Sequence, residues 1–251
     1  MEESFEDEEM ASMSSLSQGT FDPETLAKRV PPTALRYLTH AIRPGAPLAR
    51  RAEITFHGFV RMKPRLPWLS FRGRETIEAG RSFHVRARAS LGPLLVTTRD
   101  GYEQGVASAQ VRLFGLIPVM GRHGADVARS ARGRLVVEST WLPSSFLPEF
   151  GAHWSEEGSL LHLSMPIDNE DVRVRMRLES DGLLRELSLQ RWSDLTDDGG
   201  YAWIPFAAHT EAERTFGDYT VPSRLRASWW AGTDREFEFF RTEVDTIHYS
   251  T

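Results

Sequence analysis

The chain has 251 residues, of which 40% are hydrophobic and 26% charged, with a net charge of -5 at pH 7. This composition is ordinary for a globular protein with a full core, and the lack of cysteine excludes disulfides, thiolate nucleophiles and cysteine-ligated metals. Six acidic residues lie between Glu2 and Glu9, so the rest of the chain carries 29 acidic against 30 basic residues. A nearly neutral body argues against nucleic-acid binding, which needs a concentrated basic surface.

Residues 1–20 are acidic, then rich in serine and methionine, and show no periodicity. They are predicted to form a disordered tail, which can recruit a partner or can simply be a solvated terminus. The start of the chain has neither the positive charge nor the apolar stretch of a secretory signal, so a cytoplasmic location is expected. The longest nearly apolar run, 113–121, is too short to span a bilayer, and no transmembrane segment is expected.

Three helices are predicted. The prolines Pro31 and Pro32 suit the start of a helix whose apolar face ends before Pro44. A shorter helix is expected over residues 22–30. Apolar residues three and four apart predict a third helix over about 124–140, although Gly133 lowers its intrinsic helix propensity.

Most of the remaining chain alternates apolar and polar residues with period two, as half-buried strands do. Residues 172–179 show the clearest alternation, and Asp181-Gly182 then turns the chain into 183–192, which predicts a hairpin. Further strands are expected near 53–62, 69–78, 83–89, 94–100, 105–115, 159–165, 204–216, 223–231 and 236–249.

About ten strands in sequential hairpins imply one large antiparallel sheet, which must curl or close to protect its edges. We therefore predict a mainly β protein, either a curled sheet or an open β-barrel, with two or three helices packed on or plugging its concave face. No internal repeat or linker follows residue 20, so residues 21–251 are expected to form a single β-rich domain.

Several motifs that carry cofactor or metal chemistry are missing from the sequence. It has no Gly-x-Gly-x-x-Gly, no phosphate loop ending in Gly-Lys-Ser/Thr and no Gly-x-Ser-x-Gly. The eight histidines are scattered, without the close pairs that metal sites favour. The sequence therefore predicts no cofactor and no metal site.

Glu138 is a candidate catalytic residue, because it lies on the apolar side of the third helix, three residues before Trp141. A carboxylate there must find a partner or face a cavity. It can act as a general acid or base with a raised pKa, or it can form a structural ion pair with one of the many arginines.

His209 is a second candidate catalytic residue. Its spacing places it on one strand face with Glu211 and Glu213, which suits proton transfer or a hard cation. The same face can equally be the solvent face of the strand.

Glu75, Arg112, Trp141 and Trp229 are candidate ligand-binding residues. Glu75 shares its parity with apolar neighbours, as does Arg112, so both can project into a cavity and orient a polar group there; a bulge could instead move them to the rim. Adjacent tryptophans on a strand point to opposite faces, so Trp229 and Trp230 cannot both face the same layer.

Four segments of the chain resemble a family of uncharacterised bacterial proteins known only as a domain of unknown function. They are Pro-Pro-Thr-Ala-Leu-Arg-Tyr-Leu (31–38), Arg-Leu-Phe-Gly-Leu-Ile-Pro-Val (112–119), Glu-x-x-Trp-x-Pro (138–143), and Phe-Gly-Asp-Tyr with Val-Pro (216–222). The resemblance implies no established reaction. It implies an architecture similar to the open, curled sheet of bacterial lipoprotein carriers, although this chain shows no signal peptide and no lipid-attachment cysteine.

A large aromatic inventory on a β scaffold without catalytic motifs favours binding over catalysis. The leading hypothesis is a cytosolic protein that holds a hydrophobic small molecule or lipid-like ligand in the concavity of the sheet. The alternative is a cofactor-independent cyclase or isomerase acting on a specialised metabolite, with Glu138 or His209 moving protons. A third possibility is a scaffold recruited through the acidic tail. The sequence leaves open whether the protein is an enzyme.

Overall fold

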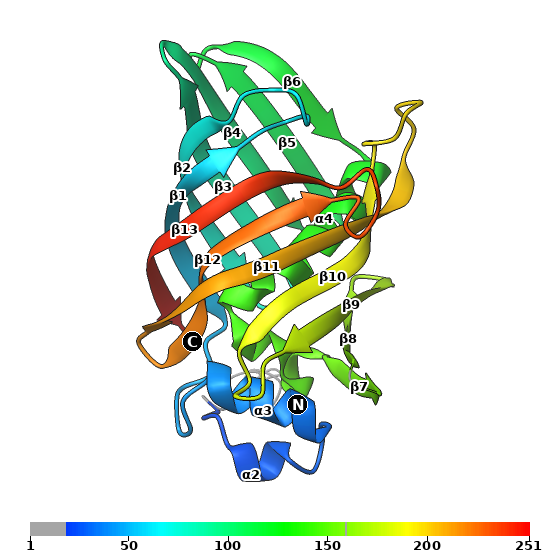
Figure 1. Ribbon diagram of the computed structural model, residues 1–251. Coiled ribbons are helices and arrows are strands. Elements are labelled where there is room, and N and C mark those ends of the chain that lie inside the picture. The colour runs from blue at the N-terminus through cyan, green and yellow to red at the C-terminus, as the bar shows by residue number, and fades with distance from the viewer. Residues whose placement is uncertain (1–18, 159) are drawn as a thin grey trace, which may run out of the picture.

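The computed structural model describes residues 19–158 and 160–251 and contains one sheet of thirteen antiparallel strands (Figure 1). In chain order the strands are β1 (Arg51–Val60), β2 (Leu69–Glu78), β3 (Ser82–Leu91), β4 (Leu94–Glu103), β5 (Val106–Leu113), β6 (Ile117–His123), β7 (His153–Glu157), β8 (Leu160–Ile167), β9 (Glu170–Leu178), β10 (Leu184–Ser193), β11 (Ala202–Phe216), β12 (Tyr219–Trp229) and β13 (Phe237–Ser250). The helices are α2 (Pro23–Leu26), α3 (Pro32–Ala41) and α4 (Ala125–Glu138), followed by the 3-10 turns η1 (Ser139–Trp141), η2 (Pro143–Phe146) and η3 (Pro148–Phe150).

The chain enters this sheet in its middle. From β1 it runs outward, hairpin by hairpin, to the edge strand β6. It then crosses to the opposite edge at β7 and returns, again by hairpins, to β13, which pairs with β1. Because β6 and β7 are the two ends of the strand order, the sheet is curled but unclosed. This confirms the mainly β, curled-sheet prediction.

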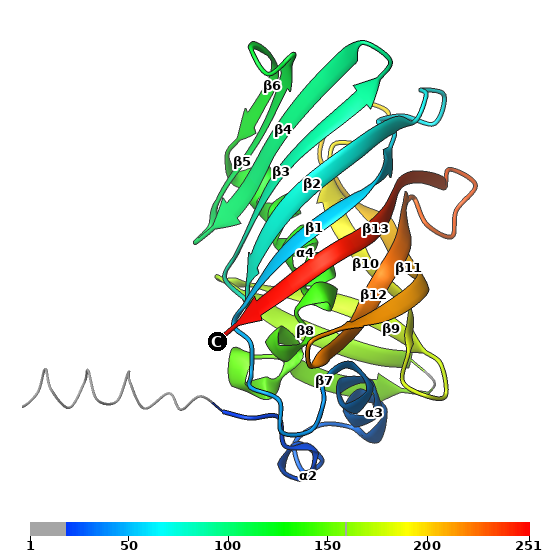
Figure 2. The same cartoon turned by 90° about the vertical axis from the view of Figure 1, so that its left-hand side faces the viewer.

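The crossing segment covers the concave face of the sheet (Figures 1 and 2). Leu135 of α4 and Phe146 of η2 are fully buried there. The Ser144 hydroxyl in η2 donates a 2.6 Å hydrogen bond to the carbonyl of Ala49, just before β1. Apolar burial and this buried hydrogen bond hold the segment against the sheet. All three predicted helices are confirmed, and Gly133 lies inside α4.

Two strands were not predicted from the sequence, and both are sheet edges. Pro118 interrupts β6, and nearly all of its residues are exposed. The short strand β7 is likewise exposed along most of its length. An edge strand that is not half-buried has no reason to alternate apolar and polar residues, so period two could not reveal it.

The predicted acidic tail falls outside the described residues, apart from Gly19 and Thr20. Thr20 forms an isolated β-bridge with Pro47, so it packs with the β-rich domain that was expected to begin at residue 21. Among the residues that the structure describes, no helix has the length and apolar character needed to cross a membrane.

Candidate functional site

A cluster of ionisable side chains lies inside the curled sheet, on the face that α4 covers. Glu75 comes from β2 and Asp100 from β4, both at inward positions of their strands. Arg134 and Glu138 come from the last turns of α4, where a spacing of four residues places them on one side of the helix. Two strands and the crossing helix therefore bring these four charges together.

Arg134 is the centre of the cluster. Its Nε lies 2.6 Å from Glu138 Oε1, and its Nη1 lies 3.0 Å from Asp100 Oδ2. Its guanidinium carbon also lies 4.7 Å from the ring centre of Phe83. Burial acts to lower the pKa of Arg134, but the charges of Glu138 and Asp100 outweigh it and raise that pKa. Arg134 therefore stays charged and pairs with two carboxylates.

Glu75 lies beside this ion-paired group and is only 3% exposed. Burial, and then the charge of Glu138, raise its pKa well above the usual value. Glu75 Oε1 and Glu138 Oε2 are both buried without a donor among the described residues. A proton on Glu75 supplies the missing donor, because only a protonated carboxyl group can donate to a carboxylate. The protonated form of Glu75 is therefore favoured.

Arg191 on β10 is the cation that this cluster leaves without a close anionic partner. It is 9% exposed, and its side chain has no hydrogen bond or ion pair with any described residue; its Nε is buried and unpaired. Its guanidinium carbon lies 5.1 Å from the ring centre of Phe206 and 4.9 Å from that of Trp229. Burial, and then the charge of Arg134, lower the pKa of Arg191 to about 9, so the side chain remains protonated at neutral pH.

Aromatic rings line the inner face of the sheet between η1 and Arg191, and we call them the aromatic wall. In order of contact they are Trp141, Phe56, Phe71, Phe240, Phe239, Trp229 and Phe206, with neighbouring ring centres 5.1–6.0 Å apart. The rings at the Trp141 end are buried, whereas Phe239 and Phe240 are only half-buried. Trp229 and Phe206 at the other end are buried as well, so the wall is partly exposed only at Phe239 and Phe240.

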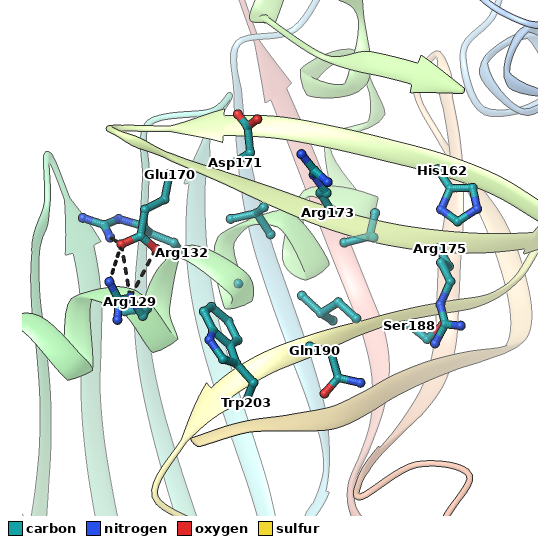
Figure 3. A pocket seen from close by; sticks show the side chains of 14 residues that line it. Arg129, Arg132, His162, Glu170, Asp171, Arg173, Arg175, Ser188, Gln190 and Trp203 are labelled. Carbon is teal, nitrogen blue, oxygen red and sulfur yellow. Dashed lines mark hydrogen bonds and ion pairs between the residues drawn. The ribbon is translucent and has the colours of Figure 1, made fainter. Parts of the chain in front are cut away.

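A slot opens beside Arg191, because β9 and β10 separate away from their turn. Their ladder begins at Leu184 and ends where Ser188 pairs with Arg175, while β9 stays paired with β8 and β10 with β11. The predicted hairpin is thus paired only near its turn. The slot has a volume of about 550 Å³ (Figure 3), a size that suits a small molecule.

The floor of the slot is Gly133 of α4. A Cβ atom at this position would lie 3.2 Å from Cγ of Arg191, so glycine allows α4 to pack closely against β10. At one end of the slot, Arg129 and Arg132 form ion pairs with Glu170 of β9 (Figure 3). The slot is therefore bounded by α4 and by both strands, and Leu189 and Gln190, the residues just before Arg191, are part of its lining.

His209 lies on the outer face of the sheet, in register with Glu186, with Nδ1 3.5 Å from Glu186 Oε2. Glu211 shares its face as expected, because it forms an ion pair with Arg226, the residue opposite His209 in the ladder. Glu213 does not, because the pairing of β11 with β12 is irregular between Thr210 and Glu213. Glu213 instead bonds to Nε2 of His40 at 2.7 Å. The sheet therefore separates His209 from Glu138.

Arg112 also lies on the outer face, so it does not join Glu75 in the interior as expected. The parity that it shares with Val106 and Phe114 was misleading, because these two residues are 73% and 51% exposed. Buried Ala107 marks the inward parity of β5. Because the outer face of β5 carries exposed apolar side chains, the alternation alone predicted that this face was the interior one.

Both candidate tryptophans lie in the interior. The Nε1 of Trp141 donates a 3.0 Å hydrogen bond to the carbonyl of Pro222, and Trp229 is part of the aromatic wall. Trp230 has a positive φ of 57° at the end of β12, and its Nε1 donates to the carbonyl of Leu195 at 3.1 Å. Neighbouring tryptophans therefore occupy different environments, as the alternation predicted.

Sequence reasoning missed three members of the site: Asp100, Arg134 and Arg191. Arg191 carried a usable signal, because it shares the parity of the buried residues Leu187 and Leu189 on β10. Within residues 19–158 and 160–251, no three histidine, aspartate or glutamate side chains are grouped as a metal ion would need.

Residues 19–242 match the model of DUF6544, described as a family of unknown function. Comparison with curated proteins gives no match. Among solved structures, a putative outer membrane lipoprotein-sorting protein domain from Vibrio parahaemolyticus is similar with a TM-score of 0.44 and 6% identity, covering 80% of this chain and 86% of that one.

Two further solved structures are similar at the same level. A DUF1329 family protein from Desulfovibrio piger has a TM-score of 0.46 and 9% identity, covering 86% of this chain and 90% of that one. A LolA superfamily protein from Nitrosomonas europaea has a TM-score of 0.43 and 7% identity, covering 87% and 92%.

Proposed function

The chain belongs to the DUF6544 family of unknown function, and from its own geometry we propose that it binds an amphipathic small molecule inside the curled sheet. The apolar body of the ligand lies on the aromatic wall, and its anionic end, a carboxylate or a similar acceptor, meets Arg191. The observation that carries this proposal is the buried guanidinium of Arg191, which has no hydrogen bond or ion pair with any described residue.

A buried cation without an acceptor is unfavourable, since it loses its hydration and gains no partner. Two aromatic faces compensate only in part, because cation–π contacts are weaker than a charge-assisted hydrogen bond. A carboxylate on the ligand would satisfy Arg191 and would be bound bidentately by its planar fork of donors. The chemistry of Arg191 therefore favours an anionic head over a neutral one.

The aromatic wall supplies the apolar half of the site. Phe239 and Phe240 are half-buried, so an apolar chain lying over them removes further surface from water, which contributes about 25 cal/mol per Å². Val60, Leu69 and Val96 are partly buried on the same inner face and continue the apolar surface towards the turns of the sheet.

Arg134 would not serve as the anion receptor, because Glu138 and Asp100 already occupy it. The neutral carboxyl group of Glu75 neighbours this ion-paired group. A protonated Glu75 adds no negative charge that would repel an anionic ligand. Its raised pKa therefore supports the proposed ligand class.

The alternative function is a cofactor-independent isomerase or cyclase, and Glu75 is the residue that favours it. A buried carboxyl group with a raised pKa is the form that general acids take. If the protein is a catalyst, the Glu75→Gln variant should still bind the metabolite but should no longer convert it. Simple binding predicts the same ligand at the same mass before and after incubation with either form of the protein.

The proposal is tested by native mass spectrometry of gently purified protein and by titration with a fluorescent fatty acid. We expect a bound or titratable anionic amphiphile, and an affinity about 10–150-fold lower in Arg191→Met, because a hydrogen bond to a charged group contributes about 1.5–3 kcal/mol. Phe239→Ser should also weaken binding. Leu160→Ser, which removes an exposed apolar side chain from β8, is the matched control.

Two results would contradict the proposal. One is a folded protein that carries no ligand and takes up no probe. The other is an uncharged analogue, such as the fatty alcohol of the same chain length, that binds as tightly as the acid and is unaffected by Arg191→Met.

A further inference from the structure

Exposed apolar side chains gather at one end of the sheet. Of thirteen large apolar residues exposed among the described residues, ten lie in or beside the β1–β2, β3–β4 and β5–β6 turns. These ten, which we call the apolar tip, are Phe59, Met62, Leu66, Leu91, Leu94, Leu95, Phe114, Leu116, Ile117 and Val119. Single exposed apolar residues are ordinary, but such a concentration marks an interaction surface.

The sheet topology places these turns side by side. Strands β1 to β6 are consecutive neighbours in the antiparallel sheet, so their three outgoing hairpins all turn at the same end (Figure 2). Helices α2 and α3 lie at the opposite end. The exposure is large, reaching 80% for Leu116 and 58% for Met62. The apolar tip is therefore one surface built from three turns.

Next to the tip, the outer face of the same strands carries six exposed arginines, which we call the arginine face. They are Arg72, Arg74, Arg86, Arg88, Arg99 and Arg112. Arg72 pairs in register with Arg88, and Arg74 with Arg86, so like charges stand directly opposite each other. Such pairs are destabilising. Their backbones are paired in the ladders, but none of the six guanidinium groups forms an ion pair or a hydrogen bond with another described residue.

Negative charge is nearly absent from this region. Segments 59–72, 88–97 and 111–120 contain no aspartate or glutamate, but they contain six basic residues. The arginine face borders a hollow of about 850 Å³ whose one acidic lining residue is Asp245. Asp245 already bonds to Nδ1 of His57 at 2.8 Å. The net charge of the chain after residue 9 is close to zero, but the structure gathers basic residues on one surface. The inference from composition that no concentrated basic surface exists is therefore corrected.

The spacing between the two surfaces matches a membrane interface. Leu95 belongs to the tip, and Thr97, two residues further along β4, is in register with Arg112. At about 3.3 Å per residue, this row of the arginine face, which includes Arg88, lies roughly 7 Å behind the tip. Interfacial apolar groups enter a bilayer by about 5–10 Å, so the arginines would lie at the level of the lipid headgroups.

We propose that the apolar tip and the arginine face together dock this protein on an anionic lipid bilayer. A nucleic acid would use the arginines but gives the apolar turns no role. A second copy related by a two-fold axis would place arginine against arginine. An anionic bilayer matches both the apolar and the cationic part, and this docking does not depend on the ligand proposed above.

Vesicle flotation tests the charge component. The protein should float with vesicles of phosphatidylcholine and phosphatidylglycerol, and much less with phosphatidylcholine alone. Arg72→Gln with Arg88→Gln should lower the partition coefficient about thirtyfold, since each cation near an anionic surface contributes about 1 kcal/mol. Arg36→Gln with Arg81→Gln, which changes two exposed arginines away from the tip, should leave it unchanged. Equal loss in both pairs, or equal binding to both vesicles, overturns the proposal.

The insertion of the tip is tested with a fluorophore. Because the chain has no cysteine, Leu116→Cys gives a single labelling site at the tip, and Val106→Cys gives one at the β4–β5 turn. An environment-sensitive dye should shift to the blue at residue 116 on anionic vesicles and stay unchanged at residue 106. Binding to a soluble polyanion as tight as to vesicles, or concentration-dependent self-association that removes the vesicle signal, would refute membrane docking. Arg191→Met should not alter either vesicle result.

Discussion

The guanidinium carbon of Arg191 lies 4.9 Å from the ring centre of Trp229, inside the curled sheet and without a hydrogen-bonded anion among the described residues. A buried arginine usually owes its position to a carboxylate partner. Here the neighbouring carboxylates, Glu138 and Asp100, are held by Arg134. This arrangement makes Arg191 costly for stability and valuable for binding, and the two effects can be separated.

Arg191→Met should raise the stability of the ligand-free protein while it weakens ligand binding. Replacing a poorly compensated buried ion by an apolar residue of similar length stabilises by about 1–4 kcal/mol in favourable cases. Urea unfolding of ligand-free protein, alongside the fluorescent fatty acid titration, measures both quantities. If Arg191→Met is strongly destabilised, an acceptor for Arg191 exists within the protein and the binding argument fails. Arg191→Lys keeps the charge and should bind with intermediate affinity.

Glu75 should make the protein less stable as the pH rises above the usual range of a glutamate. Burial and the charge of Glu138 raise the pKa of Glu75 in the folded state. Between the unfolded pKa, near 4.5, and the raised folded pKa, the folded state holds a proton that the unfolded state has released. The free energy of unfolding therefore falls with pH across this window. The loss is about 1.4 kcal/mol for each tenfold difference in proton affinity.

Glu75→Gln removes this proton while keeping a hydrogen-bond donor towards Glu138. Its free energy of unfolding should vary less over the same window and exceed that of the unsubstituted protein at the upper end. Urea unfolding at a series of pH values tests this. Glu53→Gln, which changes an exposed side chain of β1, serves as the control. Identical pH profiles for Glu75→Gln and the unsubstituted protein would show that Glu75 is ionised in the fold.

Gly73→Ala should destabilise the protein through the aromatic wall. A Cβ atom at this inward position of β2 would lie 2.7 Å from Cε2 of Phe56, whose ring contacts both Trp141 and Phe71. Overpacking of this kind typically destabilises by about 1–3 kcal/mol. A lowered melting temperature is the expected readout.

The matched control for this substitution is Gly121→Ala on β6. A Cβ atom there would have no neighbour within 4 Å. It should leave the melting temperature nearly unchanged or raise it slightly, because alanine has less conformational freedom to lose on folding. Equal effects of the two substitutions would show that the Phe56 ring has room to move.

His209→Gln should leave the affinity for the fluorescent fatty acid unchanged. His209 interacts with Glu186 on the outer face, on the side of the sheet opposite to α4 and the aromatic wall. Glu138→Gln, in contrast, removes one carboxylate from Arg134 and should alter both stability and binding. A large loss of affinity in His209→Gln, with normal stability, would mean that the ligand lies on the outer face.

Much of the interior could be predicted from parity alone. Glu75 follows the apolar residues of β2 into the core, and Glu138 follows the apolar side of α4, because burial of apolar neighbours carries a polar residue with it. The prediction for Arg112 was wrong because it also relied on apolar neighbours of the same parity, and these neighbours, Val106 and Phe114, are exposed. Alternation shows which residues share a face, but not which face is inside.

The sequence by itself determined eleven of the thirteen strands, because their period-two alternation reflects the pleat of a half-buried sheet, and it determined the positions of the three helices. Only the tertiary structure decided that β1 pairs with β13, that α4 crosses the concave face, and that Arg134 rather than Arg191 takes the carboxylates. The physical reason is the difference in sequence separation between the residues involved. Periodicity is a property of neighbouring residues, whereas pairing of charges across a sheet depends on how distant segments pack, and no local pattern encodes that distance.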